Sequence, residues 1–417
     1  MLRKSGSQNV GISRRTLVDP NGRTEKFIQL LHWRYLPLEI LQIILLFLDR
    51  SALIRMTHAC RLFRRLAIGY SRLWTVLENF CQTYDELAAY LERSNGMPLS
   101  LFATYDAPDS FVHHACATSF ADFMRLVLPH ADRWERFKFV FNTIGLDSEF
   151  PDDLFAQAGC ADLDLPRLRH LSIDCGPSIN FLPIDDWRTP QLEDFSCRNT
   201  ISTWITSETV TYFSFDYSPH EITYLDVENL LLCLDSLPSL TTLALRFGYC
   251  EAGLYSEDQG ANVYDSEDEE DDAGRRPVER VKLTKLEGLE LTINGRDDSR
   301  DLQALMGAIE APALRFLEIH LITRHGCCWV QSLVPNDADR MWPALETVSI
   351  VEGFWEPDGS ASANSNSNSN SNTNTDRSGW ALFVALARLP QVRSLYFGSP
   401  YTPLLTGAVD ANFFCDP

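Results

Sequence analysis

Cysteine and histidine are the residues of this chain whose grouping could do chemistry, because both can bind a metal or take part in nucleophilic catalysis. The sequence has 11 cysteines and 9 histidines. His113, His114 and Cys116 form one small cluster, and Cys327 and Cys328 are adjacent. Neither group has a second pair of ligands at the spacing of a zinc site. We therefore expect buried or incidental thiols, no metal, no cofactor and no disulfide framework.

The usual catalytic motifs are missing from the sequence. It has no G-x-x-x-x-G-K-[ST] phosphate loop, no G-x-G-x-x-G opening a helix, no G-x-S-x-G elbow and no H-E-x-x-H pair. A Cys–His pair or paired carboxylates stay possible, because the members of such a site need not be neighbours in the chain. The sequence predicts a protein that is not an enzyme. An enzyme with a site built from distant residues is one alternative.

Composition indicates a globular protein that works outside a membrane. The chain has 417 residues, 45% of them hydrophobic, and a net charge of −21. That charge argues against nucleic-acid binding by the whole chain. No run of 18 apolar residues occurs, so no membrane span is expected. Residues 1–30 lack the apolar core of a secretory signal, so we expect a disordered leader and a cytoplasmic and/or nuclear location.

The elements that would position a functional surface are marked by a recurring apolar pattern. One apolar residue is followed by two more at +3 and +5, and Pro often precedes the first by two. The instances are Trp134/Phe137/Phe139, Leu168/Leu171/Ile173, Leu192/Phe195/Cys197, Ile222/Leu225/Val227, Leu240/Leu243/Leu245, Leu286/Leu289/Leu291, Leu314/Leu317/Ile319, Leu345/Val348/Ile350 and Val392/Leu395/Phe397. The segment 198–220 is expected to hold one more degenerate strand. Helical spacing marks 83–96, 120–127, 302–309 and 380–387.

The pattern resembles the L-x-x-L-x-L core of leucine-rich repeats, whose period is about 20–29 residues. The resemblance implies an irregular α/β solenoid over residues 83–417. The Asn expected after each core is mostly missing: Asn294 has the right spacing, whereas Cys175, Asn199 and Asn229 come one residue early. We therefore expect irregular turns. A plain α/β domain with a parallel sheet is the alternative fold.

Two intervals between instances, after Leu240 and after Leu345, are too long for one repeat. We interpret the excess as low-complexity inserts in surface loops, at about 254–276 and 357–378. The first contains an acidic run in which Ser266 precedes three carboxylates, which resembles an acidophilic-kinase site. Ser266 is a possible phosphosite, and a solvated acidic loop is the alternative. The second contains the Asn-Ser tract from Asn364 to Asn372, a flexible loop without chemistry.

The stretch 33–75 carries the most specific pattern. Ten of the thirteen residues from Leu36 to Leu48 are large aliphatics or Phe. A helix of this kind is apolar on almost every side, too short to span a membrane, and part of a unit too small to bury every face. Part of its surface is therefore expected to face a partner. The stretch also holds six arginines and no acid between Arg50 and Arg72, which could steer docking onto an acidic partner or form a solvated face.

This stretch resembles an F-box. The matching positions are Leu36, Pro37, Glu39, Ile40, Leu41, Ile44, Leu48, Leu53, Ala59, Cys60, Arg61, Phe63, Leu66, Ala67, Leu73 and Trp74. Two residues depart from the family: Phe63 stands where Trp is usual, and Ile44 where Phe is common. An ordinary buried helical hairpin is the alternative.

The resemblance implies a three-helix module that docks on the Skp-family adaptor of a cullin–RING ubiquitin ligase. The chain would then be a substrate receptor that binds an unknown protein substrate through its repeats, and the cullin would be reached through the adaptor. The expected adaptor-binding residues are Trp33, Leu36, Pro37, Ile40, Ile44, Leu48 and Leu53. A scaffold that works independently of a ligase is a further alternative.

Overall fold

The computed structural model describes residues 36–106, 118–142, 155, 158–160, 162–175, 187–201, 207–218, 226–248, 279–294, 300–322, 333–353, 386 and 389–398. The chain divides into two compact units, Met1–Leu73 and Trp74–Pro417. Several predictions lie outside the described residues: the leader, Trp33, both inserts with Ser266, and the helix at 380–387.

The described part of the first unit consists of three short helices and a closing turn. They are α1 (Leu38–Leu46), α2 (Arg50–Ala59), α3 (Arg61–Gly69) and a 3-10 turn at Ser71–Trp74. Pro37 starts α1, where its fixed φ is suitable and its missing N–H costs nothing. Asp49 caps α2 by accepting a hydrogen bond from the Ala52 N–H at 2.7 Å. The buried core of this unit is made by Leu41, Leu45, Leu53, Phe63 and Ala67.

The second unit is built on one parallel sheet. Among the described residues it has eleven strands: β1 (Val76–Glu78), β2 (Leu99–Asp106), β3 (Trp134–Asn142), β4 (His170–Asp174), β5 (Asp194–Arg198), β6 (Tyr212–Tyr217), β7 (Thr242–Phe247), β9 (Gly288–Asn294), β11 (Phe316–Ile322), β12 (Thr347–Gly353) and β13 (Ser394–Gly398). Their spatial order is their order in the chain. A doubly wound sheet reverses strand order at a switch point, and these strands do not. Two short strands, β8 (Val281–Lys282) and β10 (Ile309–Glu310), form a separate parallel pair.

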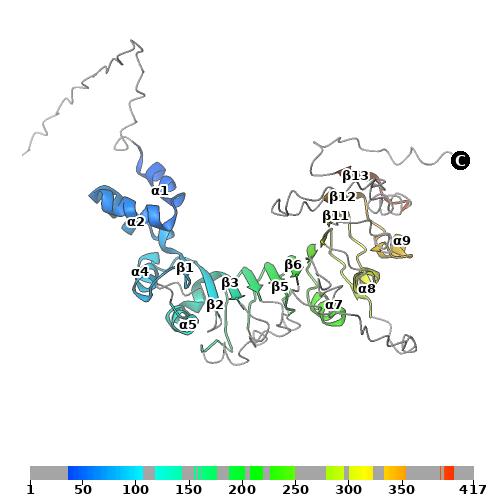
Figure 1. The fold of residues 1–417 in the computed structure, drawn as a ribbon, viewed down its shortest axis with the longest axis horizontal. Coiled ribbons are helices and arrows are strands. Elements are labelled where there is room, and N and C mark those ends of the chain that lie inside the picture. Colours follow the sequence, from blue (N-terminus) through cyan, green and yellow to red (C-terminus); the bar gives the residue numbers. More distant parts are fainter. Residues whose placement is uncertain are drawn as a thin grey trace, which may run out of the picture. The chain divides into compact units, whose positions relative to one another are not determined.

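Helices lie along one side of these strands (Figure 1). They are α4 (Tyr84–Ser94), α5 (Phe120–Val127) followed by a 3-10 segment (Leu128–Arg133), α7 (Val227–Asp235), α8 (Arg300–Ala308) and α9 (Ala338–Met341). Thr83 and Glu86 form a capping box at the start of α4, and Asn95 ends the helix in the left-handed region with φ 45°. The predicted apolar faces of α4 and α5 are buried, which confirms both helices.

Eight of the nine predicted apolar instances coincide with strands of the large sheet. The remaining instance is Ile222/Leu225/Val227: Ile222 and Leu225 lie outside the described residues, and Val227 begins helix α7. Asp226 caps that helix by accepting from the Asn229 N–H at 3.0 Å, and the apolar residues that follow have helical spacing. The strand in this part of the chain is β6, which lies within the segment 198–220 where a further strand was predicted.

Strand pairing continues directly across both long intervals in the sequence. Leu243 of β7 pairs with Leu289 of β9, and Val348 of β12 pairs with Leu395 of β13. The residues on either side of each predicted insert therefore belong to neighbouring strands, as in the shorter intervals.

Asparagine side chains connect some of the turns that follow the strands. Asn199, with φ 53°, donates from Nδ2 to the Cys175 carbonyl at 3.2 Å, and its Oδ1 accepts from the Ser218 N–H at 2.6 Å. Asn199 therefore links the turns after β4, β5 and β6 although it comes one residue early. Asn229 makes no such link, since it lies in α7. Asn79, just after β1, makes a related link to the next strand: its Oδ1 accepts from the N–H of Thr104, which lies within β2, at 2.6 Å.

Aromatic rings of β3 and α5 pack together in the core. Phe139 is fully buried, with its ring centroid 5.3 Å from that of Phe120 and 5.0 Å from that of Phe155. Phe139→Ala removes these contacts and leaves a cavity, so we expect the free energy of unfolding to fall by about 3–5 kcal/mol. Phe316→Ala, at a strand position that is 49% exposed, should cost less than about 1 kcal/mol. Denaturant unfolding followed by circular dichroism measures both. Equal losses would contradict this description of the core.

Candidate protein-docking surface

Helix α1 has a narrow buried stripe and a wide exposed apolar surface. Leu41 and Leu45, one turn apart, are buried on the side that contacts α3. The exposed residues, which we call the α1 surface, are Pro37, Leu38, Ile40, Ile43, Ile44, Leu46 and Phe47. Phe47 is 85% exposed, so this ring has almost no protein around it. An exposed apolar surface of this kind makes the α1 surface the candidate docking site of the module.

The predicted adaptor-binding residues divide between this surface and the core. Pro37, Ile40 and Ile44 are exposed, and Leu36 and Leu48 are half-buried. Leu53 is only 4% exposed, so it lies inside the module and not at its surface. The physical reason is size: a three-helix unit needs α2 to contribute apolar side chains to its core.

Several exposed apolar residues were missed by the sequence analysis. They are Leu38, Ile43, Leu46 and Phe47 of the α1 surface, and Leu62 and Ile68 on α3. The signal was present, because α1 is apolar on nearly all sides and only a stripe of it can face α3. These residues lie between the positions that match the F-box pattern, so the resemblance alone did not assign them to the surface.

Arginines give the same module a positive side. Arg55, Arg61, Arg64 and Arg65 are exposed on α2 and α3. Arg64 donates from Nε to the Thr57 carbonyl at 3.1 Å, and this hydrogen bond orients the Arg64 side chain.

The carboxyl of Asp49, which caps α2, has a lowered pKa. The hydrogen bond from the Ala52 N–H is the main cause, and the Ser51 hydroxyl adds to it. Asp49 therefore stays ionised as the cap of α2.

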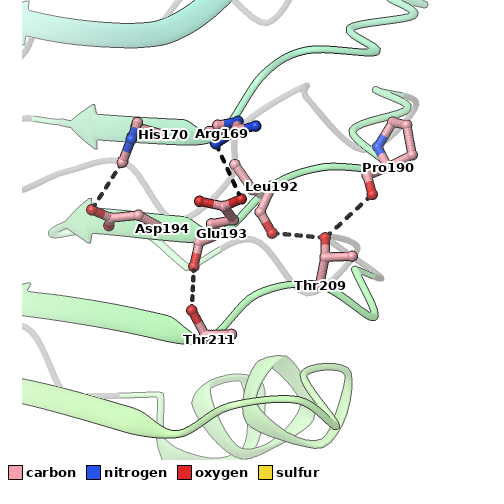
Figure 2. A network of polar contacts seen from close by, with 8 residues as sticks. All are labelled: Arg169, His170, Pro190, Leu192, Glu193, Asp194, Thr209 and Thr211. Carbon is pink, nitrogen blue, oxygen red and sulfur yellow. Dashed lines mark hydrogen bonds and ion pairs between the residues drawn. The ribbon is translucent and has the colours of Figure 1, made fainter.

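The side of the large sheet opposite the helices, which we call the open face, is a polar surface. On this face His170 lies 3.3 Å from Asp194 (Figure 2). Just before the same two strands, Arg169 lies 3.6 Å from Glu193. In the turn below, Thr209 donates to the Leu192 carbonyl at 2.8 Å and Thr211 to the Glu193 carbonyl at 3.3 Å (Figure 2). Half-exposed ion pairs of this kind contribute about 0–1 kcal/mol each. Their main effect is to fix the pattern of charge on the face.

The described residues offer no group of three or more His, Cys, Asp or Glu that could hold a metal ion. The cluster of His113, His114 and Cys116 and the pair Cys327 and Cys328 lie outside the described residues. Within the described part of the chain, no helix is long and apolar enough to cross a membrane.

Four cysteines of the second unit, Cys160, Cys175, Cys197 and Cys233, are buried. Burial raises the pKa of the thiols of Cys160 and Cys233 to about 12, and it raises the pKa of Cys175 and Cys197 as well. The thiolate is the reactive form of cysteine, so raised pKa values oppose a catalytic role.

We expect iodoacetamide at neutral pH to leave these four buried thiols unmodified in the folded protein.

The same four thiols should also make stability depend on pH. Because their pKa values are raised on folding, the unfolded chain loses thiol protons first, at about pH 8.5–9. The free energy of unfolding should therefore fall as the pH rises from about 9 towards 12, and lose nothing from these groups below that range. Peptide mass spectrometry after labelling checks the first expectation, and unfolding at several pH values the second. Rapid native labelling of any of the four would contradict their inert role.

Comparison with known proteins bears on the first unit. No curated protein matches the chain. The family model named F-box-like matches residues 33–77, which include α1, α2, α3 and the turn at Ser71–Trp74. The chain therefore has an F-box-like domain at residues 33–77, followed by a mostly parallel α/β sheet region, and its α1 surface lies within the matched stretch.

Proposed function

We propose that the chain is the substrate-recognition subunit of a Skp–cullin–F-box type ubiquitin ligase. Its F-box-like domain docks on a Skp-family adaptor, which connects it to a cullin, and its sheet region binds a protein substrate. The observation that carries this proposal is the α1 surface, an exposed apolar surface within the stretch that matches the F-box-like model. Burying one such Ile, Leu or Phe side chain against a partner contributes about 1.5–3 kcal/mol.

We further propose that the sheet region is an irregular leucine-rich-repeat solenoid. The strands follow one another in chain order, eight of the eleven coincide with the apolar pattern, and helices lie on one side of them. Stacked repeats with one strand each give this arrangement. Asn199 further supports it, since it connects successive turns as repeat asparagines do. The opposite side of the sheet is then left open for a substrate.

The proposed mechanism is positional and needs no catalytic group in this chain. Holding the substrate close to the ubiquitin-charged enzyme raises the effective concentration of its lysines. The buried cysteines Cys160, Cys175, Cys197 and Cys233 form no disulfide, which agrees with a reducing compartment, so we propose that this takes place in the cytoplasm and/or nucleus.

The double variant Pro37→Ala/Ile40→Asp tests adaptor docking. We expect it to abolish co-purification with the Skp-family adaptor, since a charge at Ile40 would be buried unpaired at the interface. The helix itself should tolerate the change, because Ile40 is 42% exposed and lies in the first turn of α1, where an acid is favourable. Co-purification of both proteins expressed together is the measurement.

Leu232→Asp is the matched control, because Leu232 is an exposed apolar residue on α7 in the other unit. It should retain the adaptor. Retention by the double variant would show that the α1 surface is not the docking site. Wild-type chain that retains the adaptor without a cullin would favour the scaffold over the ligase subunit.

A further inference from the structure

The open face of the sheet has charges of opposite sign at two separate places. Side chains alternate along each strand, and Phe137, Leu171 and Phe195 are among those buried towards the helices. The residues one position later are on the opposite side and lie in one row across neighbouring strands; all are at least partly exposed except Ala244, which is covered by its neighbours. This row, the central row, runs Lys138, Ser172, Ser196, Ser214, Ala244, Glu290, Glu318.

The basic end of the central row is on β3. Arg136 and Lys138 are two residues apart, and both point to the open face. Arg136 pairs in register with Ser100 and His170, and Lys138 with Phe102 and Ser172. None of these register partners is a carboxylate. Asp174, two residues past Ser172 on β4, is a carboxylate on the neighbouring strand, and it lies 3.7 Å from Arg198. The two cations therefore have no carboxylate directly opposite them.

The acidic end lies on β9 and β11, where Glu290 and Glu318 are direct register partners. Like charges opposite one another across two strands are destabilising. Glu290 lies 3.5 Å from Arg246, and Glu318 lies 3.0 Å from His320, whose ring is charged only when protonated. Two carboxylates thus share one permanent cation, and a further cation from a ligand would relieve their repulsion.

Between the two ends, strands β4 to β6 carry Asp174, Asp194 and Asp216 against Arg198, so the face is mildly acidic there. Arg198 lies between Asp174 and Asp216, at 3.7 and 3.8 Å. The central row itself contributes three serines here, Ser172, Ser196 and Ser214, all half-buried. Their hydroxyls can donate to the carbonyls of a chain lying across the strands.

We propose that the open face binds an extended peptide segment of a protein partner that is acidic at one end and basic at the other. The acidic side chains lie over Arg136 and Lys138, and the basic side chains over Glu290 and Glu318. Five strand spacings separate Lys138 from Glu290 and six separate it from Glu318, or roughly 24–29 Å at about 4.8 Å each. An extended chain covers that distance in about seven to nine residues. This inference rests on the proposed use of the open face for substrates and specifies their chemistry.

Fluorescence anisotropy of the full-length protein with labelled synthetic peptides tests the proposal. The matched peptide carries two Glu and two Lys about eight residues apart, joined by Gly, Ser and Thr. One comparison peptide has the two pairs about three residues apart, and two others carry only Glu or only Lys. We expect the matched peptide to bind about tenfold more tightly than each of the others, as two additional charge pairs allow, and less so at high salt.

Protein variants separate the two ends. Arg136→Glu/Lys138→Glu should weaken the matched peptide about tenfold and make the all-Lys peptide the preferred ligand, because both ends are then acidic. Glu290→Gln/Glu318→Gln should likewise weaken the matched peptide. Arg340→Glu, an exposed charge on α9, is the control and should change nothing. Equal binding of all peptides, no binding of any, or unchanged affinity in both double variants would overturn the proposal.

Co-purification of the same variants with the adaptor keeps the two proposals apart. The sheet variants leave α1 intact, so they should retain the adaptor. If the wild-type chain fails to bind the adaptor but selects the matched peptide, the ligase role is wrong and the peptide site stands.

Discussion

Parallel pairing between strands that follow one another in the chain is the constraint on which the second unit depends. Each parallel pair requires a crossover that returns the chain to the same end of the sheet. When every strand pairs with its predecessor, all crossovers run the same way, and the helices collect on one side. The other side stays open without any residue being selected to expose it. The same register places chemically unrelated side chains in straight rows, and this is why distant charges such as those of β3 and β9 have a defined separation.

The first unit is governed by a different constraint, which is the shortage of protein around a very apolar helix. Helix α1 can bury only the Leu41 and Leu45 stripe against α3, and the arginines of α2 and α3 cannot cover the rest. A module with this composition is stable enough to present an apolar surface but too small to conceal it. The F-box-like match at residues 33–77 agrees with that physical picture.

The sequence predicted strands well where the apolar pattern and the turn signals agreed. It failed at Val227, where a helix cap at Asp226 and the helical spacing of the residues that follow outweighed the strand pattern. The surface was harder to predict than the fold. Leu53 was assigned to the interface, whereas the structure buries it. A sequence motif gives the type of residue at each position but not the direction in which its side chain points. The sequence alone also could not predict which side chains form rows on the open face, since register depends on the pairing of strands that are separated in the chain.

The connections between strands also determine where the chain can gain or lose residues during evolution. β7 pairs directly with β9, and β12 with β13. The pairing of these strands therefore does not depend on the length of the chain that connects them. The entropy cost of closing a longer connection grows only with the logarithm of its length, about 0.6 kcal/mol for each doubling. These two connections are thus places where new sequence can accumulate while the rows of the open face keep their spacing. Recognition and length variation can evolve separately in the same molecule.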